Sequence, residues 1–183
     1  MKKALFTIIL MTVINSIYAQ KLLKPEIDKI SGDTTWKTSS EALYAKVTLV
    51  GANEVVGIHA EKLGGTVYIA ELAIMKPKSS QQYTISQGSK FILKFTDKTL
   101  LTLEAAKDNL VEKTGTNTTT FGSVAEGFIT HTIYALSKDA LEKLSTGSIE
   151  FVRIESSAGN IDYDVKPKLA EKVQKAFQLI KSK

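Results

Sequence analysis

Two histidines are the side chains of this sequence best suited to chemistry near neutral pH, and one has an acidic neighbour at a useful spacing. His59 and Glu61 are two residues apart, so on a β-strand both would project from the same side of a sheet. Such a pair can orient an imidazole or supply half of a metal site. Zinc takes three or four ligands, and the chain has no cysteine and one other histidine. We therefore expect a polar pair at the surface, with no bound metal or cofactor.

The second histidine, His131, alternates with Ile129 and Ile133 in a segment that predicts a strand. An imidazole on the more apolar side of a strand is expected to lie in the core with its hydrogen bonds satisfied. The other side of the same strand carries Phe128 and Tyr134. Either side could instead line an apolar pocket, so Phe128, His131 and Tyr134 are the candidate pocket residues.

Further catalytic signals are missing from the sequence. No Gly-x-Ser-x-Gly or Ser-x-x-Lys motif stands at a strand-to-helix turn, and no glycine-rich phosphate-binding loop is present. Acidic pairs such as Asp162 and Asp164 alternate with apolar residues, as half-exposed strands require. We expect no catalytic residues and a protein that is not an enzyme.

The candidate residues lie on predicted β-strands, because β-branched and polar residues alternate over several short runs in the middle of the chain. Short turns, several of them containing glycine, separate successive runs, and this predicts antiparallel neighbours. The strands predicted in this way span residues 44–50, 54–60, 66–74, 90–95, 99–103, 128–136, 149–154 and 161–165.

Two helices are predicted in the last third of the chain. Ser137 suits the N-cap of a short helix over residues 138–145, and Gly147 stands near its C′ position. Pro167 suits the first turn of a second helix that runs to about Ile180. One side of this second helix carries an apolar stripe that predicts packing against the sheet, formed by Leu169, Val173, Ala176, Phe177 and Ile180.

The N-terminal residues have the three parts of a secretory signal peptide. Two lysines follow the initial methionine, residues 4–14 are an apolar run, and Ala19 is a small residue suited to the cleavage position. We expect a signal peptide over residues 1–19 and one exported domain over residues 20–183. The lack of cysteine argues against a lipoprotein, and no later segment is apolar for long enough to span a membrane. We expect a soluble protein of the periplasm or the exterior.

The charge pattern excludes nucleic acid as a partner. The formal net charge is +5, but the basic residues are lysines spread among acids, with Arg153 as the one arginine. Arginine is the side chain that reads phosphates and guanine edges with two hydrogen bonds. The lysines therefore indicate a solvated surface.

Two features remain as candidate contacts with an unknown protein, glycan or small molecule. Trp36 is the one tryptophan, in a stretch of threonine, serine and charged residues, and is either a core residue from an edge strand or an exposed anchor. Residues 113–123 are rich in threonine and predict an exposed loop or the tip of a long hairpin. Trp36, Thr118 and Thr119 are the candidate contact residues.

Residues 17–20, Ile-Tyr-Ala-Gln, and residues 135–144 with the strand, turn, strand and helix after them resemble small secreted proteins of the Bacteroidota. The resemblance implies an exported location and a β-rich α+β fold, and it assigns no activity and no site residues. Asp33-Thr34-Thr35 is similar to the acceptor sequence for O-glycosylation of exported proteins in that group. Thr34 is therefore the candidate modification site.

Together these patterns predict an α+β domain. Its antiparallel sheet is strongly twisted or forms a partly closed barrel, with a short helix and a C-terminal helix packed on one face. The expected function is that of an exported, non-catalytic binding or interaction protein. The alternative is a small-ligand carrier with an apolar pocket between sheet and helix, and a hydrolase is the third candidate.

The N-terminal pattern predicts cleavage after Ala19. Intact mass spectrometry of the protein recovered from its own host should give the mass of residues 20–183. A covalent excess that disappears in the Thr34→Ala variant is expected if the acceptor sequence is used. The mass of the uncleaved chain would contradict the predicted signal peptide.

Overall fold

The computed structural model describes residues 21–46, 54–77, 80, 82–114, 117–119, 122–124 and 127–183. The elements are β1 (Glu26–Ile27), β2 (Thr34–Lys37), β3 (Glu41–Lys46), β4 (Glu54–Leu63), β5 (Val67–Pro77), β6 (Lys90–Phe95), β7 (Leu100–Glu104), β8 (Leu110–Thr114), β9 (Asn117–Thr119), β10 (Gly122–Val124), β11 (Gly127–Leu136), α2 (Lys138–Thr146), β12 (Ile149–Ser156), β13 (Gly159–Asp164) and α3 (Pro167–Lys181). The predicted leader, residues 1–19, lies outside the described residues.

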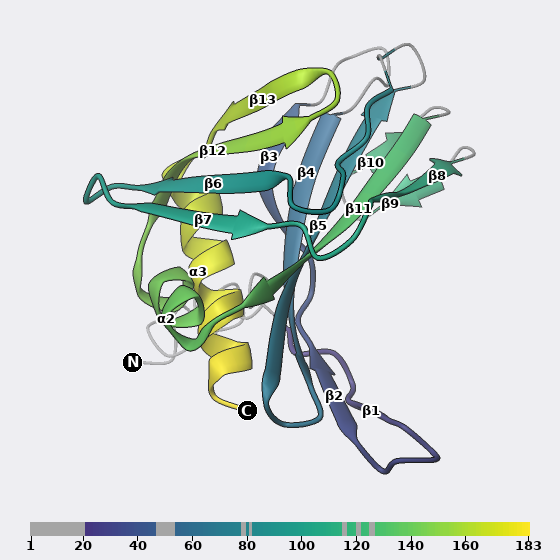
Figure 1. Ribbon diagram of the computed structural model, residues 1–183, viewed down its shortest axis with the longest axis vertical. Coiled ribbons are helices and arrows are strands. Elements are labelled where there is room, and N and C mark those ends of the chain that lie inside the picture. The colour runs from purple at the N-terminus through teal and green to yellow at the C-terminus, as the bar shows by residue number, and fades with distance from the viewer. Residues whose placement is uncertain are drawn as a thin grey trace, which may run out of the picture.

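Two larger sheets, antiparallel throughout, form the body of the molecule. The seven-stranded sheet has the order β1-β2-β4-β5-β11-β8, with β3 also paired to β4, and the four-stranded sheet has the order β13-β12-β6-β7. The long strands β4, β5 and β11 run side by side, and the β1–β2 hairpin extends from one end (Figure 1). Strands β9 and β10 form a separate pair.

The two sheets curl around one core into a half-barrel. A bridge between Ala105 and Tyr134 joins them at one seam. At the other seam the Tyr163 hydroxyl donates to Glu54 Oε1 at 2.8 Å, and the Tyr163 ring lies 4.8 Å from that of Tyr44. The predicted α+β class with a curled antiparallel sheet and two helices is confirmed.

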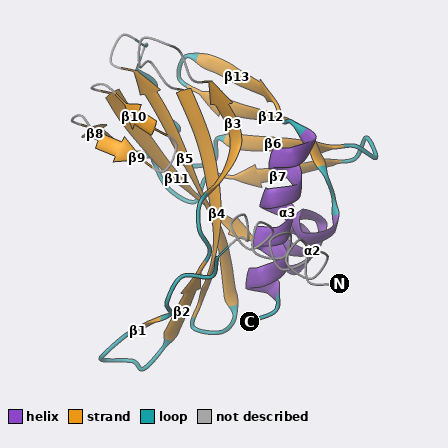
Figure 2. Ribbon diagram, turned by 180° about the vertical axis from the view of Figure 1, so that it is seen from behind, coloured by secondary structure: helices purple, strands orange, loops and turns teal. Residues whose placement is uncertain are grey.

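Helix α3 covers the side of the half-barrel that the strands leave open. It packs against β3, β4, β12 and α2, and both helices lie on one side of the long strands (Figure 2). The buried residues of α3 are Ala170, Val173, Ala176, Phe177 and Ile180. Four of them belong to the predicted stripe, whereas Ala170 was not predicted and Leu169 of the stripe is half-buried. Burial of a side chain as large as that of Phe177 stabilises the fold by about 2 kcal/mol. No helix among the described residues is long and apolar enough to cross a membrane.

The short helix α2 begins as predicted and ends differently. The Ser137 hydroxyl accepts a hydrogen bond from the Ala140 amide at 3.1 Å, as an N-cap does. Gly147 follows the last turn with φ −86° and ψ 149°, which is extended backbone instead of a left-handed C′ residue. A Cβ atom at this position would lie 2.5 Å from the Phe95 ring. Close packing, and not a positive φ, therefore requires glycine here.

The structure adds strands that the sequence patterns did not predict. Strands β1, β2 and β8 lie in segments with weak alternation, and they are paired at the edges of the seven-stranded sheet. The threonine-rich residues 113–123 include β9 and the first two residues of β10. Because β8 and β11 pair on either side of this segment, it corresponds to the tip of a long hairpin.

The Gly147→Ala substitution should lower the free energy of unfolding by about 1–3 kcal/mol, because the new methyl group forces the Phe95 ring or α2 to move. Denaturant unfolding monitored by circular dichroism measures this difference. Lys138→Ala, at an exposed position of the same helix, should leave stability nearly unchanged. Equal stability of the two variants would contradict the assigned contact.

Candidate functional site

A cluster of ionisable side chains lies on the outer face of the seven-stranded sheet, the face turned away from α3. Strand alternation creates this face: Val56, Ile58 and Ala60 of β4 belong to the core, so His59 and Glu61 project to the other side. His59 is nevertheless buried, with 6% of its surface exposed. Strand β4 is thus covered on both faces at its centre.

Strand register brings residues from four strands together here. Lys37 of β2 pairs directly with Glu61, and His59 pairs directly with Glu71 of β5. Glu71 is also opposite Ile133 of β11, so His131 lies on the diagonal, two residues away. Diagonal neighbours on one face of a sheet are within reach of long side chains.

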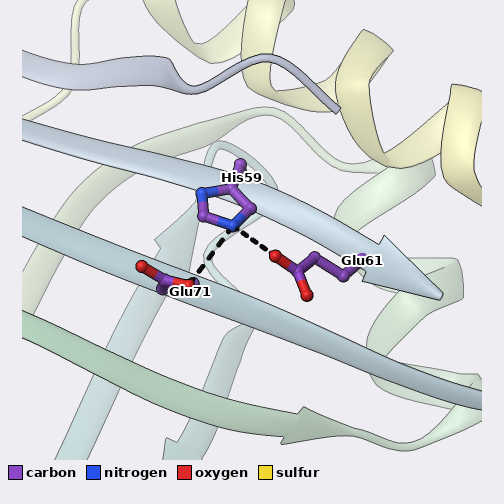
Figure 3. Close-up of side chains that lie close together, drawn as sticks. All are labelled: His59, Glu61 and Glu71. Carbon is purple, nitrogen blue, oxygen red and sulfur yellow. Dashed lines mark hydrogen bonds and ion pairs between the residues drawn. The ribbon is translucent and has the colours of Figure 1, made fainter. Parts of the chain in front are cut away.

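Three of these side chains converge on one point (Figure 3). His59 Nε2 lies 2.9 Å from Glu61 Oε1 and 3.5 Å from Glu71 Oε2. The side chains of Glu61 and Glu71 are 12% and 19% exposed. One nitrogen and two carboxylate oxygens therefore face each other within 4.8 Å in a largely buried position.

The cluster continues on both sides as a belt across the sheet. Lys37 Nζ lies 2.6 Å from Glu61 Oε1, and His131 Nδ1–H donates to Glu71 Oε1 at 2.7 Å. We call Lys37, Glu61, His59, Glu71 and His131 the carboxylate–histidine belt. Basic and acidic side chains alternate along it, so each carboxylate has partners on two sides.

These contacts lower the pKa values of the two carboxyl groups and raise the pKa of His131. The hydrogen bond from His59, supported by Lys37, lowers the pKa of Glu61 to about 2. The hydrogen bond with His131 lowers the pKa of Glu71, and the same bond raises the pKa of His131 above 6.5. Both carboxylates are therefore ionised at neutral pH, even though burial opposes this.

An open hollow of about 200 Å³ adjoins the β11 end of the belt. Glu71 and His131 form one wall of it and are shared with the belt. Leu110, at the start of edge strand β8, is 57% exposed. The full lining consists of Glu71, Lys107, Leu110, Glu112, His131 and Ile133.

The prediction for His59 and Glu61 is correct about their shared face and wrong about exposure, because His59 is buried. The core position expected for His131 is also wrong, since its side chain is 29% exposed on the outer face. The reason is that the inner face of β11 carries Thr130 and Thr132, which are buried despite their hydroxyls. The prediction from apolar residues alone therefore chose the wrong face of this strand as the buried one.

The candidate pocket residues do not meet in one place. Tyr134 is fully buried, with its ring 5.3 Å from that of Phe91. Phe128 helps to line a cavity of about 10 Å³ beside Tyr83, which is room for about one water molecule. His131 lies on the opposite face of β11 from both residues.

The candidate contact and modification residues lie elsewhere. Trp36 is half-buried against the core, with Lys183 Nζ 5.1 Å from its ring centre. Thr34, in β2, is also half-buried. Thr118 and Thr119 belong to β9.

Glu71 is the belt residue that contacts both histidines, and sequence reasoning missed it. The available signal was a single charged residue at the middle of the apolar run from Val67 to Ile74. A charge buried in a strand requires a partner, so such a residue points to a polar contact across the sheet.

Comparison of the chain with models of protein families, with curated proteins and with solved structures finds no match.

The contact between Glu71 and His131 predicts a pH-dependent stability. Because the pKa of His131 is raised above 6.5 in the folded state, the contact stabilises the protein fully below pH 6.5, as long as Glu71, whose pKa is lowered, stays ionised. This contribution is lost as the pH rises through the folded pKa. Nuclear magnetic resonance titration of the imidazole should give a pKa above 6.5, lowered in Glu71→Gln and unchanged in Glu104→Gln of the four-stranded sheet. A wild-type pKa at or below 6.5 would contradict the contact.

Proposed function

We propose that this protein is an exported, non-catalytic binding protein that receives a group of a larger partner in the hollow beside the carboxylate–histidine belt. The observation that carries the proposal is the hollow itself. It is an open site with a preformed wall, since the hydrogen bond from His131 fixes the position of Glu71.

The size of the hollow favours an interaction site over a carrier pocket. Pockets that enclose a small molecule usually measure roughly 300–1,000 Å³, whereas this hollow measures about 200 Å³ and is open. It suits one polar side chain or one sugar ring of a protein or glycan. The space between sheet and α3 is tightly filled, because Ile58, Leu72 and Phe177 are at most 1% exposed.

The chemistry of the wall supports binding without catalysis. A nucleophilic triad needs an imidazole that accepts a proton from a hydroxyl or thiol. Among the described residues, the side-chain partners of His59 and His131 are carboxylates. Lys107 and Glu112 bring both charges to the rim, and Leu110 and Ile133 add apolar contact. Such a mixed surface is typical of a recognition site.

Native mass spectrometry of the protein recovered from its own host tests this proposal. We expect a non-covalently bound protein or glycan that is lost from the Leu110→Asp variant, because a charge on the rim opposes desolvation of the hollow. Leu100→Asp is the matched control: Leu100 begins the edge strand of the other sheet and is 64% exposed.

Loss of the partner from both variants would place the binding surface outside the hollow. Hydrolysis of chromogenic ester, phosphoester or glycoside substrates that disappears in His131→Asn would overturn the non-catalytic assignment.

A further inference from the structure

We propose that His59, Glu61 and Glu71 bind one Zn²⁺ ion on the outer face of the seven-stranded sheet. The ligand atoms are His59 Nε2, Glu61 Oε1 and Glu71 Oε2, which lie within 4.8 Å of one another (Figure 3). The site shares Glu71 with the hollow, but it does not depend on the proposed binding function.

The distances from His59 to the two carboxylates are close to those of a tetrahedral zinc site. Zinc bonds to nitrogen and oxygen measure about 2.0–2.1 Å, so two ligand atoms of a tetrahedron lie about 3.3 Å apart. The observed distances from His59 Nε2 are 2.9 Å to Glu61 and 3.5 Å to Glu71. The ligand atoms of all three residues lie within 4.8 Å of one another, so the two carboxylates would have to move closer together around a bound ion.

A single proton on the imidazole nitrogen cannot form good hydrogen bonds to two carboxylates at once. Nε2 carries at most one hydrogen, which cannot form a good bond to both Glu61 Oε1 and Glu71 Oε2. A divalent ion in place of that hydrogen bonds to all three atoms at once. It also offsets the two negative charges, which is important because His59 is 6% exposed.

The donor set selects the class of ion. Calcium and magnesium bind to oxygen atoms, whereas an imidazole with carboxylates suits zinc and related transition metals. Three protein ligands leave one position of the tetrahedron for water or for a donor atom of a partner.

Neighbouring residues orient the ligands. His131 Nδ1–H holds the second oxygen of Glu71, Oε1, and so leaves Oε2 directed at His59. Hydrogen bonds of this kind around a metal site typically contribute ten- to a hundredfold in affinity. Lys37 acts in the opposite sense, because its Nζ lies 2.6 Å from Glu61 Oε1 and repels a cation. Its side chain is 39% exposed, so it can turn towards solvent when the ion binds.

Isothermal titration of the purified, untagged protein with zinc chloride tests the site. We expect one ion per chain, and a visible spectrum of tetrahedral Co²⁺ when cobalt replaces zinc. His59→Gln and Glu61→Gln should each weaken binding by at least about tenfold, because an amide is a poor zinc ligand. Glutamine also retains a hydrogen-bond donor near the position of Nε2, which favours a folded variant. Glu104→Gln, in the four-stranded sheet and outside the cluster, should bind zinc as the wild type does.

The second test looks for a gain in zinc affinity, in a variant that keeps all three metal-ligating side chains. Lys37→Met should tighten zinc binding severalfold, because it removes a positive charge beside the ion. Circular dichroism checks that each variant is folded. The proposal is overturned if the wild type does not bind zinc, or if binding is the same in His59→Gln, Glu61→Gln and Lys37→Met.

Discussion

The apolar contact between α3 and the inner face of the curled sheet is the interaction on which the rest of the structure depends. A curled sheet exposes its concave apolar face unless another element covers it. Val173 and Phe177 of α3 share one core cluster with Ile58 and Leu72 of the long strands. The chain has no cysteine, so this burial stabilises the fold without disulfides. The half-barrel and the position of the outer face both follow from it.

Burial of the inner face by α3 leaves the outer face of the long strands free to carry polar groups. At the centre of β4 these groups are themselves largely shielded from water, and a shielded charge is tolerated only with a partner. The alternation of Lys37, Glu61, His59, Glu71 and His131 meets this requirement across four strands. The same pairing holds the side chains in fixed positions, as a recognition or metal site needs.

Glu71 links the two proposals, because one of its oxygens faces His59 and the other contacts His131 at the hollow. Glu71 is therefore common to both proposed sites. An ion beside His59 would fix this carboxylate further, and a partner in the hollow would contact the same group from the other side. The outer face thus combines a rigid polar centre with an open, partly apolar rim.

The sequence by itself determined the local elements: the alternation of β4, β5 and β11, the N-cap at Ser137, and the apolar stripe of α3. These depend on periods of two and 3.6 residues that neighbouring residues set. It also placed His59 and Glu61 on one face. Tertiary structure alone decided the register, which places Glu71 opposite His59 and within reach of His131, 60 residues away in the chain. Register depends on the packing of whole strands and of α3. No local pattern could therefore reveal the whole belt. Nor could one show that the face of β11 with Thr130 and Thr132 is the buried one.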